Sequence, residues 1–210
     1  EMVKRGELTV EQLLKQGYEV AGVTMKLRGD DLPGEVEGGC CSIDDVEDAR
    51  RVARVLDIPH YVLNFTDVFR RSVVDYFVEE YRSGRTPNPC IACNRFVKFE
   101  AMLQKALALE FDYIATGHYA CIEQDHASGR WLLKRSDSKK DQSYVLYSLT
   151  QPQLSHLLLP IASYPKEEVR RMAEQWGLPV AHKADSQEIC FIPDKDYAAF
   201  IEQYAGWRAP

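Results

Sequence analysis

The sequence predicts an α/β protein with a parallel sheet that carries helices on both of its faces. Runs rich in β-branched and aromatic residues alternate along the chain with longer segments whose apolar residues recur at helical spacing. Strands that alternate with helices in this way form parallel sheets, because each crossover helix packs back onto the sheet. The 210 residues, 45% of them hydrophobic, are enough for one sizeable core.

The first half of the chain supplies three predicted helices and two predicted strands. The first helix stops at Gly17, a residue type that suits the left-handed position just past a helix end. The second begins at Ser42, which forms a capping-box-like pattern with Asp45. The third ends before a turn at residues 84–89. The predicted helices span residues 9–16, 42–56 and 67–81, and the predicted strands span residues 18–25 and 60–65.

The second half begins with an amphipathic helix and continues with a third strand, which Gly117 and His118 close. A short strand that ends at Arg135 is predicted to form a hairpin with the residues before it. The last predicted helix has Pro165 in its first turn and Gly177 at its end. The predicted helices span residues 96–109 and 165–176, and the strands span residues 111–116, 119–124 and 131–135.

Three of the predicted strand ends mark the expected ligand site. Met25, Phe65 and Gly117 each lie where a predicted strand finishes. Ligands of open α/β sheets bind in the crevice at the carboxyl ends of the strands. We therefore expect these three residues to gather around one crevice.

Composition favours a protein that works in the cytoplasm. No apolar run approaches the ~20 residues that a membrane span requires, so no membrane partner is expected. The N-terminus carries no charged-then-apolar leader of the kind that directs export. Six cysteines are too few for a disulfide scaffold in a chain of this size, so we expect reduced thiols.

Charge is distributed unevenly along this acidic chain, whose formal net charge is −6. Residues 29–49 contain eight acidic side chains and no Lys or Arg, whereas residues 130–141 carry five basic side chains against two acidic ones. A local basic surface on an acidic protein is compatible with a shaped RNA substrate. An ordinary solvated run of charges explains the same pattern equally well.

Two cysteines follow a turn rich in proline and asparagine. The stretch Thr86 to Arg95 reads Thr-Pro-Asn-Pro-Cys-Ile-Ala-Cys-Asn-Arg, and the amphipathic helix follows it directly. Cys90 and Cys93 therefore lie at or near a helix N-terminus, where the helix dipole favours thiolate over thiol. A third thiol, Cys190, lies about a hundred residues further on. The thiolate is the reactive form, so this stretch indicates sulfur chemistry.

Four other interpretations of the cysteines are open on spacing alone. They could be small buried hydrophobes or a thioredoxin-like redox pair, although that motif normally follows a strand. A zinc site needs a second matched pair, but Cys40 and Cys41 are adjacent and Cys121 is single. Three thiols could instead hold an iron–sulfur cluster with one open iron site. The ligands of such a cluster would be Cys90, Cys93 and Cys190.

Six ordered motifs, taken together, resemble the tRNA-specific 2-thiouridylases, over roughly residues 8–205. The motifs are Gly-Tyr-Glu-Val-Ala-Gly-Val-Thr-Met-Lys (17–26), Cys-Cys-Ser-Ile-Asp-Asp-Val-Glu-Asp-Ala (40–49), Gly-Arg-Thr-Pro-Asn-Pro-Cys-Ile-Ala-Cys-Asn (84–94), Ala-Thr-Gly-His-Tyr (115–119), Lys-Asp-Gln-Ser-Tyr (140–144) and Ser-Gln-Glu-Ile-Cys-Phe-Ile (186–192). The resemblance implies an ATP-pyrophosphatase domain, of the adenine nucleotide α-hydrolase-like fold, at residues 1–205. Residues 206–210 would begin a linker to tRNA-binding domains.

The resemblance also implies roles for individual residues. Cys93 matches the catalytic nucleophile, and Cys190 matches the cysteine that carries sulfur as a persulfide, in a loop that tRNA is expected to bring onto Cys93. His118 is either packed at a strand end or catalytic, and Cys121 lies outside every motif. The other matches are Met25 and Gly117 for the adenosine nucleotide, Asn88, Pro89 and Cys90 for the target base, and Lys140, Asp141 and Gln142 for a tRNA-contacting turn.

The implied reaction is ATP-dependent 2-thiolation of the wobble uridine of tRNA. Transfer of AMP onto the uridine O2 makes that oxygen a good leaving group, while Mg²⁺ offsets phosphate charge. A persulfide then delivers sulfur to C2, and a separate protein that carries a persulfide would supply the sulfur. The wobble base would have to leave the anticodon stack to reach the crevice.

The sequence departs from the family pattern at two places. The family's Ser-Gly-Gly-x-Asp-Ser-Ser phosphate loop, which grips pyrophosphate through backbone N–H groups, is missing from the given sequence. Cys90 stands where many members carry Asp, which keeps the iron–sulfur cluster open. The competing interpretations are a non-catalytic tRNA- or nucleotide-binding paralogue and an ATP-pyrophosphatase that amidates a small molecule. The latter would not need Cys93 with Cys190.

Overall fold

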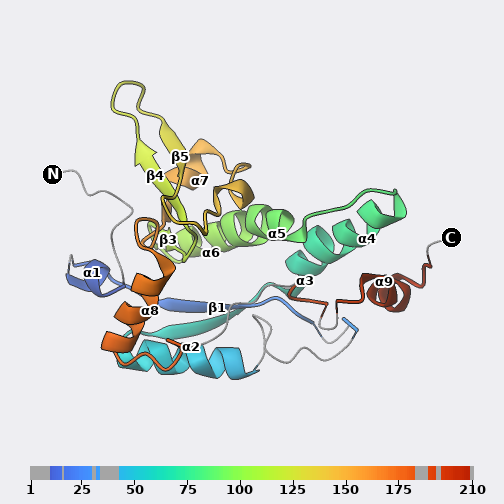
Figure 1. The fold of residues 1–210 in the computed structure, drawn as a ribbon, viewed down its shortest axis with the longest axis horizontal. Helices are drawn as coiled ribbons and strands as arrows, with labels where there is room; N and C mark the ends of the chain where they lie inside the picture. The colour runs from blue at the N-terminus through green and yellow to red at the C-terminus, as the bar shows by residue number, and fades with distance from the viewer. Residues whose placement is uncertain are drawn as a thin grey trace. The chain divides into compact units, whose positions relative to one another are not determined.

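The computed structural model describes residues 10–15, 17–29, 32–33, 43–182, 189–192 and 195–208. The chain divides into two compact units, and each unit is built from two separate chain segments. We call Ala21–Cys93 with His182–Pro210 the thiol unit, and Glu1–Val20 with Asn94–Ala181 the hairpin unit. Figure 1 shows the elements of both.

The thiol unit contains a pair of parallel strands joined through a helix. Strand β1 (Gly22–Lys26) pairs with β2 (His60–Asn64), and Met25 lies opposite Leu63 in the register. Helix α2 (Ile43–Val55) connects them and packs against both strands (Figure 1). Acidic residues in its first turn and Arg54 in its last turn complement the helix dipole. This βαβ arrangement confirms the predicted alternation and the parallel strands.

A long helical run follows β2 and leads into the aromatic core of the thiol unit. It consists of α3 (Thr66–Phe69), η1 (Arg70–Val74) with wide π-type turns, and α4 (Asp75–Arg82). Phe69 and Phe77 from this run are almost fully buried, as are Phe191 and Phe200 from the C-terminal segment. The rings of Phe69 and Phe77 lie 5.7 Å and 5.5 Å from that of Phe191, in edge-on arrangements typical of aromatic cores.

The C-terminal segment ends in helix α9 (Tyr197–Ala205), which was not predicted. Asp196 caps its first turn by accepting a hydrogen bond from the Ala199 N–H at 2.9 Å. Gly206 closes it in a left-handed conformation with φ of 60°. The helical spacing of Phe200, Ile201 and Tyr204 behind an N-capping Asp was the signal that could have revealed it.

One helical run crosses from the thiol unit into the hairpin unit. It comprises α5 (Pro89–Ala92), η2 (Cys93–Ala101) and α6 (Met102–Ala108), and the division between the units falls after Cys93. The run begins at Pro89, earlier than the predicted start at residue 96. The proline at the first helical position needs no N–H partner and has a helix-compatible φ. The backbone is irregular through Asn88, as predicted, and the helix begins at Pro89.

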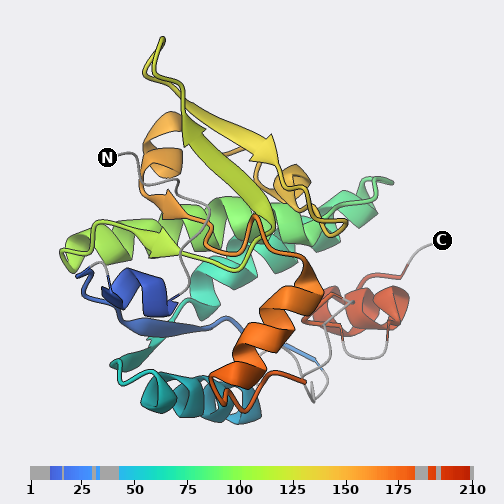
Figure 2. The same ribbon diagram turned by 60° about the vertical axis from the view of Figure 1, so that its left-hand side comes forward.

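The hairpin unit takes its name from β4 (Ala120–Gln124) and β5 (Trp131–Arg135), which pair antiparallel as predicted (Figure 2). Its parallel pair is β3 (Ile114–Ala115) with β6 (Leu157–Leu158). Four more helical segments complete the unit: α1 (Val10–Lys15), η3 (Ser143–Val145), α7 (Gln151–Ser155) and α8 (Lys166–Gln175).

Side-chain amides tie the hairpin unit together. The Gln151 side chain bonds both the N–H and the C=O of Trp131 in β5, each at 2.8 Å. Gln153 donates to the Phe99 carbonyl at 2.8 Å, which connects α7 to the long helical run. Buried Leu13 and Leu158 pack with Val20 and Tyr113 beneath β6. Neither α7 nor β6 was predicted.

Two predicted strands are shorter in the structure because helix ends use their first residues. Tyr18 N–H bonds back to the Leu13 carbonyl, so β1 starts at Gly22 instead of residue 18. Phe111 N–H likewise bonds to the Ala106 carbonyl, which leaves only Ile114–Ala115 in β3. Across the described residues the strands form three separate pairs, where the sequence predicted one parallel sheet.

No helix in the described ranges is both long and apolar enough to cross a membrane.

Candidate functional site

The turn before α5 is built around the side chain of Asn88. Its Oδ1 accepts hydrogen bonds from the N–H groups of Cys90 at 3.1 Å and Ile91 at 3.3 Å, which caps the helix. Pro89 occupies the first helical position and is buried. The cap uses only the carbonyl oxygen of Asn88, and the amide NH₂ takes no part in it. Asn88, Pro89 and Cys90 therefore form one rigid turn, as their predicted role requires.

Cys90 and Cys93 lie in the first turn of this helical run, three residues apart. Their exposure differs, because Cys90 is exposed and Cys93 is buried. The turn that carries them packs against η1, where Val73 and Val74 are fully buried. The predicted placement at a helix N-terminus is confirmed.

Cys190 lies on a short turn of the same unit, and the next two residues anchor it. Phe191 and Ile192 are 2% and 1% exposed, and the Ile192 N–H closes the turn on the Ile189 carbonyl at 3.0 Å. Cys190 itself is half-buried and carries a free thiol. The structure anchors this turn in the aromatic core, and the predicted movement of Cys190 onto Cys93 on tRNA binding stays a prediction.

Arg28 is a residue of this region that the sequence analysis missed. Its guanidinium donates to the carbonyls of Leu32 at 2.8 Å, Pro33 at 2.7 Å and Phe191 at 3.4 Å. It thereby joins the segment after β1 to the turn of Cys190. Its position close behind the first predicted strand was the only signal in the sequence.

The predicted nucleotide contacts fall in different units. Met25 lies in β1 of the thiol unit, half-buried, and Gly117 lies just after β3 of the hairpin unit, exposed. A Cβ added at Gly117 would make only an ordinary contact of 3.7 Å, to the Ile161 side chain. The packing of the protein therefore tolerates a side chain at this position, so a bare backbone there leaves room for a ligand.

His118 is a packed and neutral histidine. It is 8% exposed, its Nδ1 lies 2.8 Å from the Thr116 hydroxyl, and its ring packs against that of Phe99. Burial, assisted by the charge of Lys98, lowers the pKa of His118 to about 4. A neutral imidazole of this kind is a poor proton donor near neutral pH, which favours packing over catalysis.

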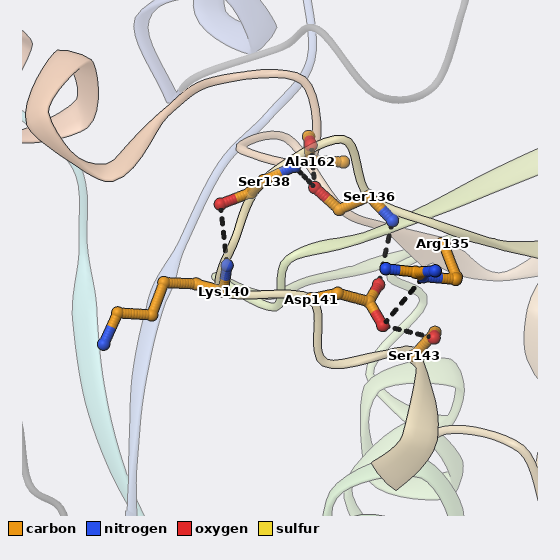
Figure 3. A network of polar contacts seen from close by, with 7 residues as sticks. All are labelled: Arg135, Ser136, Ser138, Lys140, Asp141, Ser143 and Ala162. Atoms are coloured by element: carbon orange, nitrogen blue, oxygen red, sulfur yellow. Dashed lines mark hydrogen bonds and ion pairs between the residues drawn. The ribbon is translucent and has the colours of Figure 1, made fainter.

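The turn at Lys140, Asp141 and Gln142 is held by a polar network (Figure 3). The Asp141 carboxylate accepts hydrogen bonds from the Ser136 N–H at 2.9 Å and the Ser143 hydroxyl at 2.8 Å. Burial alone would raise the pKa of Asp141, but these bonds, with Arg135 nearby, outweigh burial and lower that pKa. Gln142 exchanges two hydrogen bonds with the backbone of Tyr119, at 2.7 Å and 3.1 Å.

Lys140 has a different place in this turn. Its backbone N–H bonds to the Ser138 hydroxyl at 3.2 Å, while its exposed side chain extends away from the network (Figure 3). Of the three predicted tRNA contacts, Asp141 and Gln142 therefore shape the turn, and Lys140 presents its charge to solvent.

The other predicted groups add no metal site. In the part of the chain that the structure describes, no three His, Cys, Asp or Glu side chains form a group that could hold a metal ion. The three thiols therefore do not fit an iron–sulfur cluster in this arrangement. Burial raises the pKa of Cys121, as expected of a packed thiol. Cys40, Cys41, Ser42, residues 183–188 and the segment before Val10, where the phosphate loop was sought, lie outside the described residues.

Comparison with known proteins supports one family. The family described as "tRNA methyl transferase HUP domain" matches residues 7–194. The proteins named tRNA-specific 2-thiouridylase MnmA from Clostridioides difficile and Acetivibrio thermocellus are 57% and 59% identical to this chain over 197 and 194 residues. These matches cover 93% and 91% of this chain but 55% and 54% of the relatives.

The same name belongs to a relative from Symbiobacterium thermophilum, which is 57% identical over 199 residues. The chain spans about half the length of the curated relatives it matches. With a matching stretch that includes β1, the first turn of α5, the Lys140 turn and Cys190, the chain belongs to the tRNA methyl transferase HUP domain family.

Proposed function

We propose that this chain is the catalytic domain of an ATP-dependent tRNA-uridine 2-sulfurtransferase that thiolates the wobble uridine. The observation that carries the proposal is the presence of two cysteine side chains, Cys93 and Cys190, in one compact unit. Cys93 begins η2, directly after the capped turn α5, and Cys190 lies on an anchored turn. The printed names of the relatives favour sulfur transfer over other tRNA modifications.

The proposed chemistry uses the two thiols in different roles. Cys190 carries the incoming sulfur as a persulfide, received from a separate protein that carries a persulfide. Transfer of AMP from ATP to the uridine O2 releases pyrophosphate and makes O2 a good leaving group. The Cys93 thiolate attacks Cys190 Sγ and forms a disulfide, and the expelled sulfide attacks C2 as AMP departs. A dithiol reductant must then reopen the disulfide.

The remaining predicted contacts supply binding. Met25 and Gly117 would meet the adenosine nucleotide, and the turn Asn88–Cys90 would meet the target base. For the finer fold we propose a parallel sheet with helices on both faces, of the adenine nucleotide α-hydrolase-like kind. Mg²⁺ would neutralise charge on the triphosphate of ATP, although the described residues form no metal-binding group. The cytoplasm is the proposed location.

The decisive experiment removes each thiol in the complete gene product. Cys93→Ser and Cys190→Ser should each reduce thiolation of a wobble-uridine tRNA transcript to below about 1% of wild type, because each supplies a bond that serine cannot form. Thiolation is measured by the retardation of thiolated tRNA in a mercury-containing gel. Thiolation by either variant at more than a few per cent of wild type contradicts the two-thiol chemistry.

Cys90→Asp is the matched control for these substitutions. Because many members of the family carry Asp at this position of the base-contacting turn, and because Cys90 stands outside the Cys93–Cys190 pair, this variant should keep most of the activity. Iron and acid-labile sulfide measured on anaerobically purified protein should stay well below one cluster per chain. Stoichiometric iron and sulfide, lost together with activity in Cys90→Asp, would establish an iron–sulfur cluster instead.

A non-catalytic tRNA- or nucleotide-binding paralogue is the alternative function. The wild-type gene product should release AMP and pyrophosphate from ATP only in the presence of tRNA. A protein that binds tRNA but neither consumes ATP nor thiolates uridine would support the alternative.

A further inference from the structure

The loop that carries Lys140 is fixed to the segment that leads into α8. The Ser136 hydroxyl donates to the Ala162 carbonyl at 2.5 Å and accepts from the Ser138 N–H at 3.0 Å. The Ser138 hydroxyl in turn accepts from the Lys140 N–H. This chain of bonds, drawn in Figure 3, runs from Ala162 to Lys140, and α8 begins only four residues after Ala162, at Lys166. These bonds therefore tie the backbone at Lys140 to the segment that precedes α8.

Two basic residues lie in the first half of α8, the helix that follows the segment to which the loop is bonded. Lys166 and Arg170 are one helical turn apart, so their side chains share a face of α8. Burial lowers the pKa of Lys166, and the positive charges of Arg170 and Lys140 lower it further, against a weaker opposite effect from Glu167. Glu167 and Arg170 also act on the half-buried Tyr119, whose pKa is raised mainly by burial. Lys166 therefore lies within electrostatic reach of both Lys140 on the loop and Arg170 on its own helix.

Like charges placed one helical turn apart destabilise a helix. An anion that binds among the three side chains would relieve the repulsion among them. Both Lys140 and Arg170 are exposed, so the cluster is open to a ligand from solvent. On a chain with a net charge of −6, this cluster is a localised basic surface, in contrast to the diffuse charge of a general polyanion binder.

We propose that Lys140, Lys166 and Arg170 together bind phosphodiester groups of the tRNA substrate, so that α8 is part of the RNA-binding surface. This inference rests on the proposed function, which names tRNA as the substrate, and it adds two residues of α8 to the contact expected at Lys140. An extended polyanion fits exposed cations on a loop and a helix face, whereas a mononucleotide is normally held in a concave pocket. Serine-mediated bonds position Lys140, and the i,i+4 spacing positions the other two.

The test measures the salt dependence of tRNA binding by the complete gene product. Each phosphate contact that is lost should lower the slope of log Kd against log salt concentration by about one. Lys166→Gln and Arg170→Gln should each weaken binding roughly 3- to 10-fold at low salt, and to the same degree for transcripts with uridine or cytidine at the wobble position. The triple variant with Lys140→Gln should lower the slope by about two to three.

Neighbouring residues of the same type provide matched controls. Arg171 lies next to Arg170 on α8 but is paired with Glu168 at 2.5 Å, and Lys139 lies next to Lys140 on the loop. Arg171→Gln and Lys139→Gln should leave both affinity and slope within about twofold of wild type. Thermal unfolding of every variant should stay close to wild type, because the substituted side chains are exposed or, for Lys166, half-buried.

The outcomes separate this inference from the proposed function. With saturating tRNA the variants should thiolate at the wild-type maximal rate, with only KM for tRNA raised. The proposed phosphate contacts would be contradicted if the salt slopes did not change, or if Arg171→Gln and Arg170→Gln lowered tRNA affinity equally, even if thiolation is observed. A loss of ATP affinity without a loss of tRNA affinity would assign the cluster to nucleotide phosphates and would equally overturn it. If the wild-type protein did not thiolate tRNA, the proposed function would be contradicted. The salt slopes of tRNA binding would still test the phosphate contacts of Lys140, Lys166 and Arg170.

Discussion

Single side chains in this protein differ sharply in how far burial has changed their chemistry. His118 is buried beside Thr116 and Phe99 and stays neutral, with a pKa of about 4. Lys140 lies about twenty residues further along the same unit and remains exposed and charged. Both belong to motifs that the sequence analysis associated with function, so motif membership alone did not separate a packed residue from a surface contact. Burial separates them.

The neutral state of His118 makes protein stability depend on pH. In the unfolded chain the histidine takes up a proton below about pH 6.5, whereas in the folded protein it does so only near pH 4. Between these values the unfolded state binds more protons, so the free energy of unfolding falls as pH falls, by up to about 3 kcal/mol. Urea unfolding at several pH values should show this loss, and His118→Gln should remove most of it.

The exposed His126 at the tip of the hairpin provides the control for this measurement. His126→Gln should retain the pH dependence of wild type, because its environment changes little on unfolding. Full pH dependence in His118→Gln would mean that other groups, and not this buried imidazole, bind the protons.

At the level of elements, the serine-rich turn of residues 136–143 is the clearest case of a motif whose members cooperate. Asp141 bonds Ser136 and Ser143, and Gln142 bonds Tyr119, so their side chains hold the backbone that presents Lys140. This assigns Asp141 a positioning role, although the resemblance implied a direct contact with tRNA.

Asp141→Ala tests that role, because two physical effects predict opposite results. Removing a carboxylate near Lys140 should strengthen binding of a phosphate by Coulomb attraction alone. If Asp141 holds the turn, its removal instead leaves the Ser136 N–H and the Ser143 hydroxyl without their acceptor, and Lys140 loses its position. We expect tRNA affinity to fall roughly 3- to 10-fold, as measured by filter binding.

Asp137 offers the comparison for this prediction, since it is an exposed acid in the same turn. Asp137→Ala should leave affinity unchanged or slightly raise it. Stronger binding by Asp141→Ala would show that the carboxylate acts only through its charge.

Elements that are determined by local sequence signals could be predicted, and elements that form only through long-range pairing could not. The β4–β5 hairpin, α2 and α8 carry their own periodicity and end signals, and the structure contains them near the predicted bounds. Strands β3 and β6 are two residues long and form only by pairing with each other across more than forty residues. No local pattern reports such a pairing. The start of α5 was missed because Asn88 and Pro89 break regular structure in most contexts and begin a helix here.

The same distinction applies to the candidate site. The candidate thiols were evident from the motif around Cys90 and Cys93 and from Cys190, since residue type alone points to sulfur chemistry. What fixes the Cys190 turn was not evident, because Arg28 and Phe191 act through contacts between distant segments. The predicted roles of Met25 and Gly117 stay predictions.

For the whole molecule, the decisive feature is that the thiol unit is discontinuous in sequence. The C-terminal segment returns after the entire hairpin unit to place Phe191 and Phe200 against Phe69 and Phe77. These rings complete a core that the first segment cannot complete alone. The packing of this segment thereby brings Cys190 into the unit that contains Cys93.

The double variant Phe191→Ala/Phe200→Ala tests this dependence. Each buried Phe→Ala change typically costs about 3–5 kcal/mol, and because the two rings touch, the costs need not add. A loss of roughly 5 kcal/mol or more approaches the whole stability of an ordinary domain.

We expect hydrogen exchange to rise throughout β2, α3 and α4 while α6 and the β4–β5 hairpin stay protected. Thiolation should be lost although Cys93 and Cys190 remain. Leu132→Ala, at a partly exposed position of β5, should change neither pattern. Equal deprotection of both units in the double variant would show instead that they unfold as one cooperative body, and the segment's effect on Cys190 would then be indirect.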